Sequence, residues 1–258
     1  MSVAGHRALP PLELRQRPDD YLAREFHPTL VAELKACGGL WVAGDAYTSA
    51  SEVVAQARDR KVDALGLDFR DLSLLRDLPD LLHLEVSSDR RPVLDPIASL
   101  TRLRSLTLHT SAMRGELDPL GFPDLRWLTL PLGGKGGAAM LPSMLRDHPA
   151  LEHLKVRETK AKTVAELVSG FPRLRSFAMG YADHVRTLGD LSPVAGTLRE
   201  LDLWMVPGFR SIEGIDVLTG LERLRLHASK LIDLSPLDAL PRLRHVDVRT
   251  GTVTIRRP

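Results

Sequence analysis

The sequence predicts an α/β protein built as a solenoid, in which short parallel strands alternate with short return segments. A six-residue pattern with apolar residues at its first, fourth and sixth positions recurs eight times along the chain. The fourth residues stand at 84, 106, 128, 154, 177, 201, 224 and 246, so that the copies are 22 to 26 residues apart. Proline stands two residues before five of the copies, where it fixes the backbone ahead of a strand.

Alternation within each copy separates a core side from an outward side. In a strand, successive side chains point to opposite faces, so the fourth and sixth residues of a copy share one face. In the copy at 151–156, Leu154 and Val156 therefore enter the core, while His153 and Lys155 point outward. Weaker copies near 40 and 65 raise the total to about ten units. No unit could bury its apolar face alone, so we expect neighbouring units to share one core.

Both ends of such a stack need covering, because an open strand edge exposes unpaired backbone groups. Residues 1–38 are predicted as an N-terminal segment with a helical cap, because an amphipathic helix fits 19–36. The repeats occupy 39–258 and end in a β-hairpin with strands near 245–248 and 252–255. Since both ends have a cover, we expect a complete protein.

The repeated pattern resembles the leucine-rich-repeat family, and its period near 22 resembles the short bacterial class found in internalins. The resemblance implies a right-handed solenoid with a curved parallel sheet on its concave face. Short helical, 3-10 or extended return segments would form the convex face. One departure is the complete absence of asparagine, which the family usually places in the turn after each strand. The resemblance also implies protein binding by the concave face, although one fold serves many roles.

Composition narrows the location and the class of partner. With 35 basic and 33 acidic residues, the chain is too nearly neutral to require a nucleic acid or an anionic membrane. No run of 18 apolar residues and no signal peptide is present in the sequence. The single cysteine, Cys37, excludes an internal disulfide. We expect a cytoplasmic protein, monomeric and without a cofactor.

The outward strand positions collect residues that are common at interfaces. All three tryptophans and five of the nine histidines fall there. Tryptophan and arginine often anchor protein interfaces, although such residues can also simply cover the sheet. Strand adjacency predicts two partner-binding groups. They consist of Trp127, His153, His109, Lys155 and Arg157, and of Trp204, His227 and Arg249.

Enzyme and metal hypotheses find little support in the sequence. His83 with His109, and His227 with His245, stand in opposite outer columns of adjacent strands, about 13 Å apart along the strand and too far for one zinc ion. The run 133–137 (GGKGG) contains lysine but lacks the order and the hydroxyl of a phosphate loop. Cys37 stands at a predicted helix end, which disfavours a thiolate.

The sequence therefore predicts a non-enzymatic protein-binding module that uses the concave face of the solenoid, and no metal site. Two alternatives remain open. One is an inhibitor or immunity-like protein that occludes a partner enzyme. The other is a sensor of a small ligand or peptide that uses the 133–137 loop as its moving part.

Overall fold

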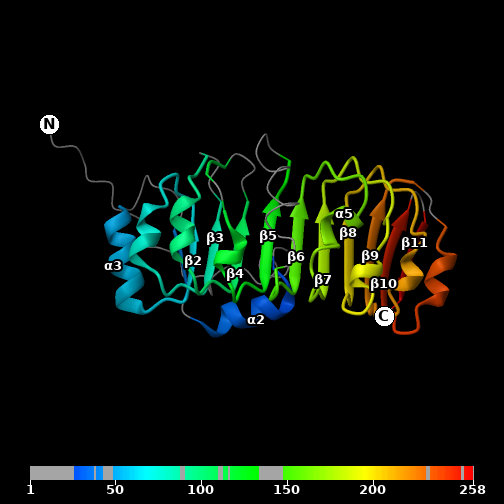
Figure 1. Ribbon diagram of the computed structural model, residues 1–258, viewed down its shortest axis with the longest axis horizontal. Helices are drawn as coiled ribbons and strands as arrows, with labels where there is room; N and C mark the ends of the chain where they lie inside the picture. The colour runs from blue at the N-terminus through cyan, green and yellow to red at the C-terminus, as the bar shows by residue number, and fades with distance from the viewer. Residues whose placement is uncertain are drawn as a thin grey trace. The chain divides into compact units, whose positions relative to one another are not determined.

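A computed structural model describes residues 26–37, 39–42, 49–87, 91–109, 113–115, 117–133, 148–230 and 233–250, with the backbone of 253–257 (Figure 1). The chain forms two compact units, unit 1 (Met1–Leu125) and unit 2 (Arg126–Pro258). Each unit is an array of short strands with a return segment between most successive strands. Of the 133–137 loop, only Gly133 lies within the described residues.

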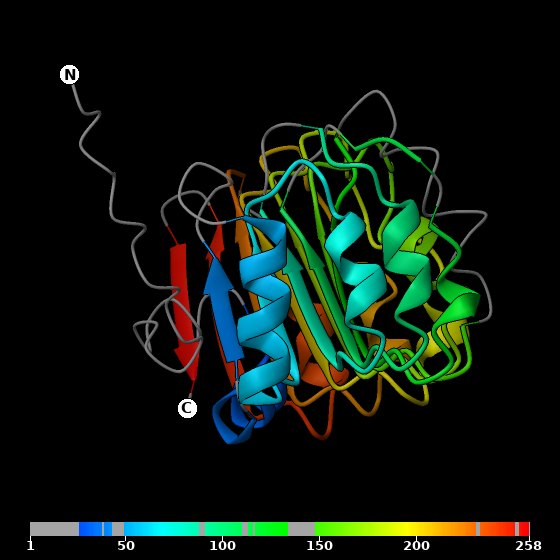
Figure 2. The ribbon, with the colours of Figure 1, turned by 90° about the vertical axis from the view of Figure 1, so that its left-hand side faces the viewer.

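Among its described residues, unit 1 contains four parallel strands, which are hydrogen-bonded in chain order. They are β1 (Gly39–Val42), β2 (Ala64–Leu67), β3 (His83–Val86) and β4 (Ser105–Leu108). The return segments are the α-helix α3 (Ala50–Arg60) and the 3-10 helices η2 (Ser73–Asp77), η3 (Asp95–Ser99) and η4 (Pro119–Gly121). Helix α3 and the first two 3-10 helices line one side of these strands (Figure 2).

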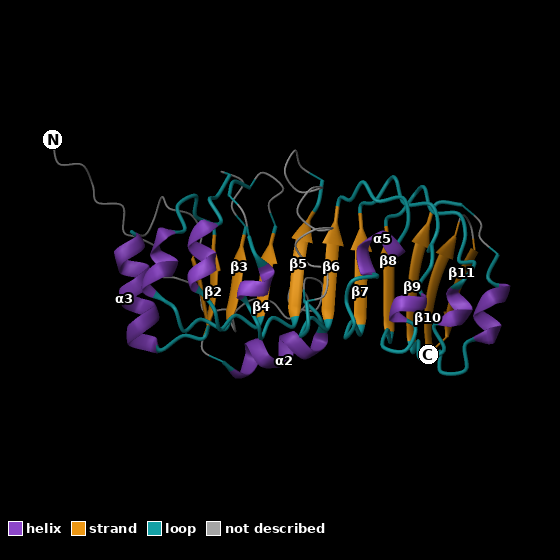
Figure 3. Ribbon diagram, viewed as in Figure 1, coloured by secondary structure: helices purple, strands orange, loops and turns teal. Residues whose placement is uncertain are grey.

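The described part of unit 2 contains six parallel strands, also paired in chain order, and one antiparallel strand (Figure 3). The strands are β5 (Trp127–Pro131), β6 (His153–Arg157), β7 (Ser176–Gly180), β8 (Glu200–Trp204), β9 (Arg223–Ala228), β10 (His245–Thr250) and β11 (Val253–Arg257). The returns are α5 (Ala165–Val168), η5 (Ser192–Val194), η6 (Ile215–Val217) and η7 (Ser235–Ala239). The expected hairpin is thus present, because β10 pairs antiparallel with β11.

The strand register places equivalent residues of successive repeats side by side. Leu84 pairs with Leu106 in unit 1, and Leu201 pairs with Leu224 in unit 2. These four leucines are at most 3% exposed, and burying each contributes about 1.5–3 kcal/mol. The predicted parallel strands and their alternating core residues are confirmed, and the fold is a leucine-rich-repeat solenoid with short helical returns.

The return segments begin with a recurring local turn. An aspartate carboxylate accepts a hydrogen bond from the backbone N–H two residues later at Asp71, Asp118, Asp190 and Asp233. Such turns tighten the chain and lead directly into the 3-10 helices. Proline follows in the first turn of η3, η5 and η7, where a missing N–H costs nothing.

The described N-terminal helix is shorter than the sequence predicts. Helix α2 (Pro28–Ala36) begins at a proline, after His27, whose Nδ1 accepts a hydrogen bond from the N–H of Thr29. Residues 19–25 of the predicted cap lie outside the described part of the chain. The helix buries Leu30 and Leu34, and it reaches the third strand, because Glu33 Oε2 lies 3.6 Å from His83 Nε2. Among the described residues, no helix is long and apolar enough to cross a membrane.

Candidate functional site

The outward residues of strands β8, β9 and β10 in unit 2 form a surface that solvent reaches in part. In β9, Arg223 and Arg225 are exposed while Leu224 and Leu226 are buried. Buried residues also alternate with exposed or half-buried ones in β10, and with half-buried ones in β8. We call the outward residues of these three strands the unit 2 strand face. They are Glu200, Asp202, Trp204, Arg223, Arg225, His227, His245, Asp247 and Arg249.

An aromatic cluster of Tyr181, Trp204 and Met205 lies at one border of this face. The rings of Tyr181 and Trp204 meet edge to face, with centroids 4.6 Å apart and planes at 75°. The Trp204 indole lies over Gly180, its register partner in β7, where a Cβ atom would collide with it. Tyr181 is 47% exposed and Met205 is 54% exposed, so these large apolar side chains face solvent. Because Gly180 and Tyr181 fix the indole, the cluster presents a preorganised apolar surface.

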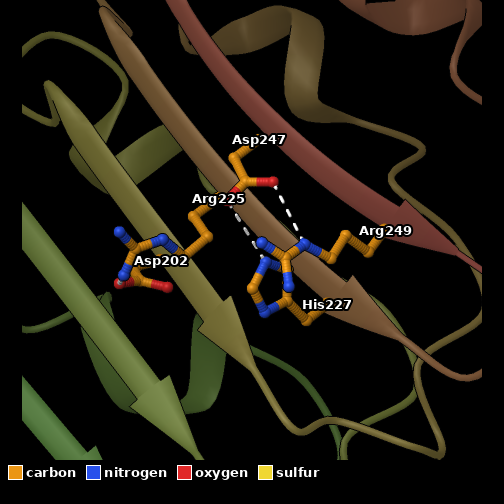
Figure 4. A network of polar contacts seen from close by, with 5 residues as sticks. All are labelled: Asp202, Arg225, His227, Asp247 and Arg249. Carbon is orange, nitrogen blue, oxygen red and sulfur yellow. Dashed lines mark hydrogen bonds and ion pairs between the residues drawn. The ribbon is translucent and has the colours of Figure 1, made fainter. Parts of the chain in front are cut away.

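Charged side chains on β8, β9 and β10 form pairs from strand to strand (Figure 4). Arg225 Nη1 donates to Asp202 Oδ2 at 3.0 Å. Asp247 lies between two basic side chains, with 3.5 Å from its Oδ2 to His227 Nε2 and 3.4 Å from its Oδ1 to Arg249 Nε. Another ion pair joins Arg223 Nη1 to Glu200 Oε1, with 3.6 Å between these atoms. Every carboxylate of the face therefore has an arginine beside it.

The carboxylates lie deeper than the arginines that accompany them. Burial raises the pKa of Asp202 above its ordinary value, although the nearby Arg225 and His227 act in the opposite direction. The raised pKa means that the free-energy cost of removing water from the charged Asp202 carboxylate exceeds the attraction that the neighbouring side chains provide. Chemically, the face offers guanidinium donors and an aromatic surface, which suit binding and lack a nucleophile paired with a base.

The predicted group around Trp127 is arranged differently. Trp127 pairs with His153 in register, and the two rings stack with centroids 5.7 Å apart and planes at 6°. The position points outward as predicted, yet Trp127 is only 6% exposed, so the indole offers a partner little surface. Lys155 and Arg157 on β6 are half-buried. The group is therefore better suited to stabilising β5 and β6 than to forming an open surface.

His109, the remaining predicted site residue, lies in unit 1. Its Nε2 lies 3.0 Å from Glu85 Oε1, and both side chains are largely buried. On the adjacent strands, His83 Nδ1 is 2.9 Å from Ser105 Oγ. Burial lowers the pKa of His83 to about 4, and the nearby Arg104 adds to this shift. His83, Glu85 and Ser105, which point outward from β3 and β4, are thus buried and have polar partners in the neighbouring repeat.

The sequence analysis missed Tyr181 and Met205, because its outward columns end with the last strand residue. These two, together with Glu158 of the preceding repeat, have left-handed backbone conformations, with φ of 54°, 51° and 54°. Each of the three stands one residue after its strand. A column drawn one position further along the repeats would have revealed the exposed tyrosine and methionine.

The described residues show no grouping suited to a metal ion. No set of three or more His, Cys, Asp or Glu side chains within them could hold one. Cys37 is the C-cap of α2, and burial, followed by Asp63, raises the pKa of its thiol to about 11. The thiol is therefore protonated at neutral pH, and a protonated thiol is a poor nucleophile.

Comparison with known proteins supports the repeat architecture. An internalin from Listeria monocytogenes matches with a TM-score of 0.54 at 21% identity, over 76% of this chain. The Toll-like receptor TLR13, solved in complex with the RNA ssRNA13, matches with a TM-score of 0.53 at 12% identity, over 83% of this chain. The chain has the leucine-rich-repeat fold.

The leucine-rich-repeat chain is shorter than these proteins, and its match spans 57% of the internalin and 40% of the receptor. No protein-family model matches the sequence, and no curated protein matches it. At these identities the two likenesses concern the fold alone. The binding site has to be argued from the side chains of this chain.

Proposed function

We propose that this chain is a non-enzymatic protein-binding module of the cytoplasm, and that the unit 2 strand face together with the aromatic cluster contacts the partner. The observation that carries the proposal is the alternation on β8, β9 and β10, where leucines or valines are buried and the charged or aromatic residues between them are half-buried or exposed. Arginine and tryptophan are enriched among residues that dominate binding energy.

The fixed position of Trp204 supports the same proposal. A large side chain that is already ordered loses little entropy when a partner covers it. Gly180 beneath the indole and Tyr181 at its edge provide that order before binding. Of the residues predicted from the sequence, Trp204, His227 and Arg249 form the centre of the proposed site. Trp127 and His153 lie on β5 and β6 of the same unit, where their rings stack on each other.

The test is a pull-down from the native cytosol with four forms of the protein. Trp204→Ala removes the anchor, and Gly180→Ala displaces it, because the new Cβ collides with the indole. Gly196→Ala is the matched control, since a Cβ there meets nothing within 4 Å. We expect the wild type and the control to capture the same protein. Both test variants should bind it more weakly, by about 2 kcal/mol or more.

Far-UV circular dichroism and thermal unfolding of each form show whether the fold is retained. Equal capture by the folded Trp204→Ala variant would contradict the site assignment. It would move the binding surface to the return segments. The fold would be unaffected by that result.

A further inference from the structure

We propose that the partner segment is acidic and carries a large apolar side chain, so that its carboxylates meet the arginines of β9 and β10 and its apolar group covers the aromatic cluster. This inference rests on the proposed function and names the chemistry of the partner. Two features of the unit 2 strand face carry it: the depth at which its charges lie, and the placement of its apolar surface beside them.

Depth sorts the charges of the face by sign. The side chains of Arg223, Arg225 and Arg249 are 54%, 55% and 46% exposed. The carboxylates that accompany them, on Glu200, Asp202 and Asp247, are only 28%, 30% and 29% exposed. An approaching molecule therefore meets guanidinium groups first. Each guanidinium has several N–H donors, and an exposed one can bind a second carboxylate while it keeps the first.

The same pattern favours a protein segment over a nucleic acid. A surface that follows a phosphate backbone is overwhelmingly basic, because every phosphate it meets carries a charge. Here three carboxylates alternate with the arginines, so a continuous row of phosphates would also meet repulsion. Separate carboxylates spaced along a peptide can instead contact each guanidinium in its planar, two-donor geometry.

The apolar part of the partner follows from adjacency. Strand β8, which carries Trp204, is hydrogen-bonded to β9, which carries Arg225, and β10 with Arg249 follows. Neighbouring strands lie about 4.8 Å apart, so the indole and the two arginines lie within reach of one short segment. Tyr181, which follows β7, widens the apolar surface on the side away from the arginines, and Met205 extends it past the end of β8. A segment that crosses the strands would place its apolar side chain at β7 and β8 and its acidic residues at β9 and β10.

The experiment is a selection of peptides from a random display library on the full-length chain, followed by affinity measurements on the enriched peptides. The test variant is Arg225→Gln with Arg249→Gln. The control variant is Arg173→Gln with Arg242→Gln, which changes the net charge equally at two exposed arginines outside the strands. We expect the enriched peptides to combine Asp or Glu with an aromatic or large aliphatic residue. Their affinity should fall about tenfold per arginine in the test variant and stay unchanged in the control.

One further variant, Trp204→Ala, separates this inference from the proposed function. Neutral or basic peptides that bind the test variant at full strength, yet lose affinity in Trp204→Ala, would overturn the acidic-partner inference and leave the proposed function standing. Peptides unaffected by either the arginine or the tryptophan changes would overturn both. A single-stranded oligouridylate probe that binds more tightly than any selected peptide, and loses affinity in the same arginine variant, would replace the acidic segment by a nucleic acid.

Discussion

The outward face of β2, β3 and β4 in unit 1 and that of β8, β9 and β10 in unit 2 follow the same strand alternation but differ in burial. In each of the strands β2, β3 and β4 all four residues are buried, including His83, Glu85 and Ser105. In unit 2 the leucines are buried while residues such as Arg223 and Arg225 are exposed. Strand alternation therefore decides which way a side chain points, and the surroundings decide whether water reaches it.

This difference in burial also predicts different roles for the two faces. A buried polar group needs a partner, and unit 1 supplies short contacts between His83 and Ser105 and between Glu85 and His109. In unit 2 the charged pairs lie near solvent, where ion pairs contribute about 0–1 kcal/mol. The unit 1 face should therefore affect stability, and the unit 2 face should affect binding.

The largest expected effect compares two outward tryptophans within unit 2. Trp127→Ala should lower the free energy of unfolding by about 3–5 kcal/mol, because a buried indole leaves a cavity and loses its stacking on His153. Trp204→Ala should cost about 1 kcal/mol, since this indole is half-exposed and contacts chiefly Tyr181. Urea unfolding of both variants measures the difference. Equal losses would mean that burial does not separate the two positions.

The second largest expected effect is a loss of stability in acid, where the free energy of unfolding falls by about 3 kcal/mol at most. The pKa of His83 is about 4 in the folded protein and about 6.5 in the unfolded chain, so the folded state binds fewer protons between these values. Stability should therefore fall as pH falls from about 6.5 towards 4. His83→Gln, which removes the titrating group, should flatten the curve of unfolding free energy against pH. An unchanged slope in that variant would assign the acid sensitivity to other groups.

The smallest effect compares one polar contact from each face. Ser105→Ala should destabilise the protein by about 1 kcal/mol, because His83 loses a buried hydrogen-bonding partner. Arg223→Ala should change stability by less than about 0.5 kcal/mol, since its pair with Glu200 is exposed and 3.6 Å long. Thermal unfolding of both variants at low and high salt provides the check. A larger loss in Arg223→Ala would reverse the ranking of the two faces.

Much of the fold follows from the sequence, because leucine spacing alone predicts the strands, their parallel order and their core side. The outward orientation of Trp204, His227 and Arg249 follows from the same spacing, and their role in binding stays a prediction. The burial of Trp127 and of His109 could not be predicted, because it depends on contacts that no repeat pattern encodes. Helix α2 shows the same limit: its apolar spacing predicts a helix, but not its contact with His83 of β3.

Among the described residues, a glycine lies beneath a tryptophan ring at two places, with Gly66 under Trp41 and Gly180 under Trp204. In both pairs the two residues are register partners on adjacent strands. This arrangement imposes an order on mutational history. A lineage can acquire the tryptophan usefully only after the neighbouring strand has glycine at the facing position. Once the tryptophan is present, replacing the glycine displaces the ring. We therefore expect the two positions, one repeat apart in sequence, to change together among related sequences.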